Sequence, residues 1–98
     1  MNPELQPAPA ALTEATLNEL AANFPAPDLH AAAADRFWLA EQQLAGAFDA
    51  YEGKTVAAYN KQVIGVGDHY VRLLMELSAK YSIHPGRIAL VYIGDEFA

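Results

Sequence analysis

The sequence predicts an α+β fold, in which N-terminal helices are followed by a β-hairpin–α–β three-stranded sheet. Three observations support this fold class. Helix-like apolar spacing fills much of the first half of the chain. Two short segments rich in Val, Ile and Tyr then flank Asn60 and Lys61, a pattern typical of a hairpin. An amphipathic segment and a continuously apolar segment follow, which indicate a helix and a last strand.

The first residues differ in composition from the rest of the chain. Residues 1–11 carry Pro3, Pro7 and Pro9 among small residues, which predicts an extended, disordered arm. The 98-residue length suits one domain. We therefore expect residues 12–98 to form a single α+β domain, with its hairpin–helix–strand part at residues 53–94.

A first helix is expected over residues 13–23. Thr16 with Glu19 has the spacing of a capping box, and Thr13 is an equally good start. Its apolar face holds Leu17, Leu20 and Phe24. The helix either docks on the core or serves as a detachable recognition helix.

A second, longer helix is expected over residues 29–51. Pro25 and Pro27 interrupt the chain before it, and Asp28 is a good N-cap. Gly53 is expected to end it. One apolar stripe follows the helix, formed by Ala33, Phe37, Ala40, Leu44, Ala47, Phe48 and Tyr51. We interpret this stripe as the core face, with Trp38 on its flank and Leu39 on the opposite face.

The segments KTVAAY and QVIGVG form the predicted hairpin, with Asn60 and Lys61 as its two-residue turn. A continuous helix over residues 55–81 is the competing interpretation. Gly65 and Gly67 oppose it, because each glycine in a helix costs about 1 kcal/mol relative to alanine.

The third helix is expected over residues 68–81, with Asp68 at its N-cap. Residues 87–94, RIALVYIG, predict a strand covered on both faces. A right-handed crossover lays this strand parallel to the second hairpin strand. Either hairpin strand can then be the central strand, and the sequence does not decide between them.

The segment YEGKTVAAYNKQVIGVGD, followed by an amphipathic helix and an apolar strand, resembles a family of small prokaryotic domains of unknown function. The resemblance covers about residues 44–94. It departs at Thr55, where the family usually has tryptophan, and at Lys61, where glycine is commoner. It implies the hairpin and no catalytic residue. The matching residues are Tyr51, Gly53, Lys54, Val56, Ala57, Val63, Ile64 and Gly67.

Composition bounds the function classes. Six basic residues are scattered among twelve acidic ones, which argues against nucleic acid and against an anionic membrane surface. No apolar run is long enough for a membrane span. The start of the chain has no signal-peptide pattern, so a cytoplasmic location is expected. There is no cysteine, which excludes a disulfide or thiolate chemistry.

No motif predicts catalysis, a metal site or a cofactor. GVGDHYVRLL falls short of a phosphate-binding glycine loop, and Asp68 would repel a phosphate at the helix start. His30, His69 and His84 lack metal-ligand spacing.

We therefore predict a non-enzymatic protein-interaction or regulatory domain that self-associates as a homodimer or binds a protein partner. The expected interface residues are Trp38, Leu39, Val91, Tyr92 and Ile93. The alternative is a small-ligand-binding protein or enzyme with a site at the hairpin-to-helix junction, near Tyr59 and residues 65–69.

Overall fold

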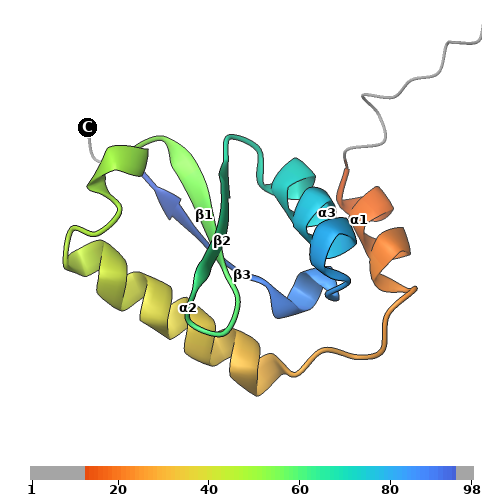
Figure 1. Ribbon diagram of the computed structural model, residues 1–98. Coiled ribbons are helices and arrows are strands. Elements are labelled where there is room, and N and C mark those ends of the chain that lie inside the picture. Colours follow the sequence, from red (N-terminus) through yellow and green to blue (C-terminus); the bar gives the residue numbers. More distant parts are fainter. Residues whose placement is uncertain (1–12, 95–98) are drawn as a thin grey trace, which may run out of the picture.

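The computed structural model describes residues 13–94, so the predicted arm at residues 1–11 lies outside the described residues. Figure 1 shows a three-stranded sheet with helices on both sides, and the predicted α+β class is confirmed. Two helices precede the hairpin, and a third joins the hairpin to the last strand. In chain order the elements are α1 Glu14–Ala21, α2 Leu29–Leu44, η3 Asp49–Tyr51, β1 Lys54–Ala58, β2 Val63–Gly67, α3 Tyr70–Tyr81, η4 Pro85–Arg87 and β3 Ala89–Ile93.

Side-chain caps fix the starts of the first two helices. The Thr13 hydroxyl accepts a hydrogen bond from the amide of Thr16 at 3.2 Å, so Thr13 rather than Thr16 begins α1. A carboxylate oxygen of Asp28 accepts one from the amide of Ala31 at 3.1 Å and begins α2, as predicted.

The second helix ends earlier than the sequence predicts. It stops at Leu44, and Gly46 follows with a φ of +83°. A turn and the short η3 helix then lead to Gly53, whose φ of +85° is used just before β1. Both glycines adopt the left-handed region, and the chain uses the first of them to leave the helix.

The predicted hairpin is confirmed and the continuous helix is wrong. Asn60 and Lys61 have φ values of +55° and +56°, as a two-residue type I′ turn requires. The amide of Tyr59 donates to the carbonyl of Gln62 at 2.9 Å and closes the turn. The register shifts between Ala57 and Ala58, so the hairpin carries a bulge near its tip.

The strand order is β2-β1-β3, with β1 antiparallel to both neighbours. The first hairpin strand is thus the central one, and β2 and β3 point the same way. Strand β1 is buried from Thr55 to Ala58, which fits its central position.

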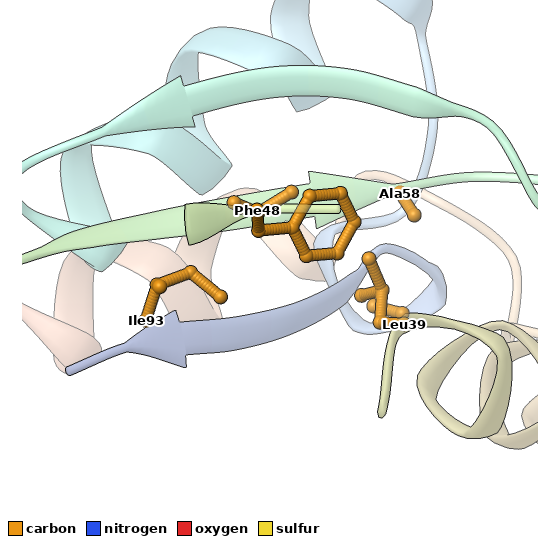
Figure 2. Packing of buried hydrophobic residues seen from close by; sticks show 6 residues of the cluster. Leu39, Phe48, Ala58 and Ile93 are labelled. Carbon is orange, nitrogen blue, oxygen red and sulfur yellow. The ribbon is translucent and has the colours of Figure 1, made fainter. Parts of the chain in front are cut away.

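Side chains alternate between two faces of the sheet and form two separate cores. One core lies between the sheet and α2 (Figure 2), and its buried residues are Leu39, Phe48, Val56, Ala58, Ala89 and Ile93. The other lies under α3, and its buried residues are Ala57, Leu73, Leu74, Leu77 and Ile88. Leu17 of α1 packs against the second core, so α1 docks beside α3.

Helices α2 and α3 cover opposite faces of the sheet. Two expectations about α2 are wrong. Leu39, expected to face outward, is 0% exposed and lies at the centre of the first core. The face that is buried carries Ala32, Asp35 and Leu39. The part of the predicted core stripe that lies in α2, from Ala33 to Leu44, is consequently on the outside of this helix, whereas Phe48 beyond its end is buried in the first core as predicted.

Candidate functional site

The two glycines of the hairpin-to-helix junction serve packing. A Cβ added at Gly65 would lie 2.9 Å from Cδ1 of Leu77, and one at Gly67 would lie 3.4 Å from Cδ1 of Leu73. Both leucines belong to α3. The missing side chains therefore let α3 lie close on β2, and neither glycine opens a cradle for a phosphate.

Asp68 does not cap α3, contrary to expectation. The cap position belongs to His69, whose side chain makes no capping hydrogen bond. The Asp68 carboxylate instead accepts a hydrogen bond from Nζ of Lys54 at 2.6 Å. That hydrogen bond and the positive charge of Lys54 lower the pKa of Asp68. The ammonium joins the start of β1 to the residue after β2, because Thr55 and Gly67 are paired in the sheet.

The alternative ligand site is only partly assembled. A hollow of about 120 Å³ lies at the junction and is lined by Val66, Gly67, Asp68, His69, Arg72, Leu73 and Glu76. Tyr59 lies at the other end of β1, with its ring against the guanidinium of Arg87. Within residues 13–94, no group of three or more metal-ligating side chains comes together. The junction thus brings Asp68 and His69 to one hollow and leaves Tyr59 out of it.

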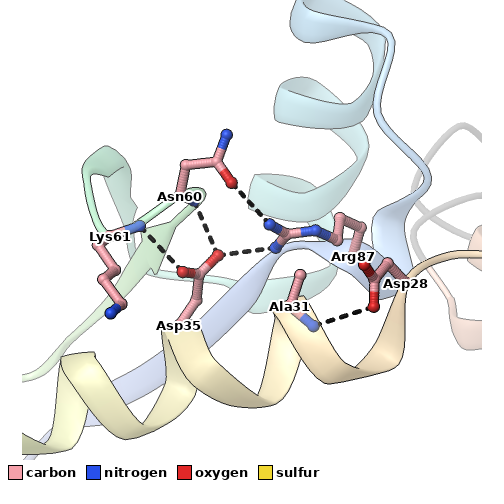
Figure 3. A network of polar contacts seen from close by, with 6 residues as sticks. All are labelled: Asp28, Ala31, Asp35, Asn60, Lys61 and Arg87. Atoms are coloured by element: carbon pink, nitrogen blue, oxygen red, sulfur yellow. Dashed lines mark hydrogen bonds and ion pairs between the residues drawn. The ribbon is translucent and has the colours of Figure 1, made fainter.

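A buried ion pair and the hydrogen bonds around it join three segments that are distant in sequence (Figure 3). Asp35 of α2 and Arg87 of η4 are 2% and 8% exposed, and their Oδ2 and Nη1 atoms are 2.7 Å apart. The amides of Asn60 and Lys61 donate to the same carboxylate at 2.8 and 2.9 Å. Nη2 of Arg87 donates to the side-chain oxygen of Asn60 at 2.9 Å.

This network fixes the hairpin tip to α2. Two successive left-handed residues turn their amides to one side, and such a concavity binds anions. Here the anion is the side chain of Asp35. Burial alone would raise the pKa of Asp35, but the hydrogen bonds from Arg87, Asn60 and Lys61, with the charge of Arg87, together lower it. The hydrogen bonds of this carboxylate to Arg87 and to the two turn amides join α2, η4 and the hairpin tip, so the network stabilises the fold.

The sequence held a signal for this network. Ala32, Asp35 and Leu39 lie on one helical face, so burial of that face predicts a buried carboxylate that needs a cation. The sequence predicts the other face of the helix as the core face, because the apolar stripe on that face has more large side chains.

The predicted interface residues fall into different environments. Leu39 and Ile93 are buried in the first core, and Trp38 and Val91 pack against that core while partly buried. Tyr92 is the one exposed member of the set, at 59%. The structure thus gathers four of them around one core and leaves only Tyr92 largely open to solvent.

Among the described residues, the large apolar side chains with the highest exposed fractions belong to α2. Leu29, Phe37 and Leu44 are 65%, 69% and 89% exposed. Ala33, Ala40 and Ala47 are exposed between and beyond them. We call Ala33, Phe37, Ala40 and Leu44 the outer stripe, since their spacing of four, three and four residues keeps them on one side of the helix.

An open hollow of about 720 Å³ lies at the end of the outer stripe. Its walls come from the end of α2, the η3 turn and the end of β3. The lining residues are Gln43, Leu44, Asp49, Glu52, Ile93 and Gly94. The hollow therefore combines apolar walls with two carboxylates.

No helix among the described residues has the length and apolar character to cross a membrane. A scan of protein-family models and searches of curated proteins and of solved structures found no match for the chain. The resemblance to the small prokaryotic domain family accordingly stays a prediction.

Proposed function

We propose that the chain is a non-enzymatic protein-interaction or regulatory domain that self-associates through the outer stripe of α2. The observation that supports this most is the exposure of Phe37 and Leu44 on one side of a regular helix. Contiguous exposed apolar patches on a folded domain mark interaction surfaces or aggregation-prone sites. Single exposed apolar residues are ordinary, but here four apolar residues share one side over three turns.

The first core supports the same proposal. Leu39, Val56 and Ile93 already fill the inner side of α2, so the outer stripe is not needed to complete the fold. An amphipathic surface helix places polar residues outward. Helix α2 departs from this pattern, and a partner that covers the outer stripe accounts for the departure.

The test is the absolute mass in solution, measured by size-exclusion chromatography with light scattering over a dilution series. We expect the wild-type chain to show a mass above the 10.6 kDa of one chain at high concentration. Phe37→Glu places a charge in the stripe and should give single chains at every concentration. A surface substitution of this kind changes folding stability by only about 0.5 kcal/mol.

Tyr92→Glu is the matched control, because Tyr92 is also exposed and aromatic but lies on β3. It should associate as the wild type does. Loss of association in Tyr92→Glu but not in Phe37→Glu would move the interface to β3. A single-chain mass for the wild type throughout would overturn self-association.

A further inference from the structure

The outer stripe alternates small and large residues. Ala33 and Ala40 are small, and Phe37 and Leu44 are large and exposed. In an antiparallel pair of α2 helices, one two-fold axis between positions 38 and 39 sets position 33 opposite 44 and position 37 opposite 40. Every large side chain then meets an alanine of the second copy. Close packing at an interface requires such complementarity.

One edge of the stripe leads to the acidic hollow. Leu29, Arg36 and Gln43 are seven residues apart and so lie along one line of the helix. Gln43 lines the hollow. The same two-fold axis places this line of residues next to the same line on the second copy, which runs in the opposite direction. Leu29, which is 65% exposed, then extends past the end of the other α2 to the level of the hollow.

Charge favours the same arrangement. Arg36 is exposed, and it forms no ion pair with any residue from 13 to 94. The hollow carries Asp49 and Glu52. The antiparallel axis turns the Arg36 edge of each copy toward the hollow edge of the other. A parallel pair would instead bring both acidic hollows to one end.

The contact area requires more than the stripe. The 16 residues of α2 give a helix about 24 Å long. A stable dimer buries about 800 Å² per partner, which one narrow helical stripe does not supply. Insertion of Leu29 into the hollow at both ends of the pair extends the contact beyond the stripe.

From these observations, and resting on the proposed function, we infer that the two copies pack antiparallel along the outer stripe, with Leu29 of each copy in the hollow of the other. This assembly is isologous, because the same surface serves both copies.

Cysteine pairing tests the geometry directly, since the full chain has no cysteine of its own. An equal mixture of Ala33→Cys and Leu44→Cys chains should form a disulfide-linked dimer under mild oxidation. Ala33→Cys alone should not, because eleven residues of helix separate the two cysteines by about 16 Å. A disulfide requires Cα atoms within about 7 Å.

The outcomes separate this inference from the proposed function. Rapid crosslinking of Ala33→Cys alone would mean a parallel pair and would overturn the inference. A wild-type dimer that Phe37→Glu abolishes, with no crosslink in the mixture, would also overturn it and leave the proposed function standing. A single-chain mass for the wild type would overturn both the antiparallel arrangement and the proposed self-association.

A charge reversal tests the contact with the hollow. Arg36→Glu should weaken dimerisation on the order of tenfold, because the contact occurs twice in each dimer. Adding Asp49→Lys to the same chain should restore most of the affinity. If Arg36→Glu did not change the dimerisation affinity, or if the double variant did not restore it, the hollow would lie outside the interface.

Discussion

The outer stripe of α2 carries more apolar residues than the inner face, yet only the inner face is buried. The inner face contains Ala32, Leu39 and the charged Asp35. The outer stripe contains two alanines with Phe37 and Leu44 and no charge. The face with the carboxylate is buried because Arg87 and the hairpin turn supply all its hydrogen bonds. Apolar content alone therefore does not decide which face meets the core.

The largest expected effect is on the inner face at Asp35. Asp35→Ala leaves Arg87 buried without its anion, and breaking a buried pair in this way costs about 3–5 kcal/mol. Asp28→Ala on the same helix removes only a cap and should cost about 1 kcal/mol. Urea unfolding at one protein concentration measures both, and equal losses would contradict a special role for the network.

The carboxylate of Asp35 should also make the free energy of unfolding depend on pH in the acid range. The pKa of Asp35 is lowered in the folded state, so its contribution is fully present above the unfolded pKa of about 3.9 and is lost as pH falls through the folded value. Asp35→Asn should therefore flatten the decline of the unfolding free energy below about pH 4. If the unfolding free energy of Asp35→Asn fell with decreasing pH as steeply as that of the wild type, other carboxyl groups would be responsible for the decline.

Truncation of a leucine and of a phenylalanine should separate the two faces most plainly. Leu39→Ala opens a cavity in the first core and should lower the free energy of unfolding by about 2–5 kcal/mol. Phe37→Ala should change it by only about 0.5 kcal/mol, if measured where the chains are dissociated. Comparable losses at the two positions would mean that the outer stripe also packs within one chain.

The glycines under α3 should give an intermediate effect. Gly65→Ala forces a methyl group against Leu77 and should cost about 1–3 kcal/mol. Gly67→Ala meets Leu73 at an ordinary contact distance and should cost less. Thermal unfolding of the two variants provides the comparison, and a larger loss at Gly67 would contradict the packing described under α3.

The smallest effect is expected for the exposed ion pair. The side chains of Lys54 and Asp68 are 46% and 80% exposed, so water screens their attraction. Lys54→Ala or Asp68→Ala should lower the free energy of unfolding by less than about 1 kcal/mol. A loss as large as that of Asp35→Ala would mean that exposure does not distinguish the two ion pairs.

Much of the fold could be predicted from local patterns. Asn60 and Lys61 specify the hairpin turn, because asparagine tolerates the left-handed region. The fold class and the amphipathic third helix follow from periodicity. The sequence left the strand order open, because both orders satisfy the same local preferences. The placement of α2 and α3 on opposite sides of the sheet depends on contacts between elements that are distant in sequence, so local patterns do not predict it.

The errors share one cause. Phe37 and Leu44 make the outer stripe look like a core face, and Asp35 makes the inner face look like a surface. Only the long-range approach of Arg87 and the turn reverses this preference. The prediction that Asp68 caps α3 fails for a similar reason. Its carboxylate pairs with Lys54, which is distant in sequence but adjacent in the sheet.

The most direct test of the separation between the two faces is the urea midpoint measured at several protein concentrations. If the outer stripe pairs two copies, the wild-type midpoint should rise with concentration by mass action. Phe37→Glu should instead keep one midpoint, equal to that of the most dilute wild type. A wild-type midpoint independent of concentration, or a Phe37→Glu chain that no longer folds, would contradict the assignment of folding to the inner face and association to the outer stripe.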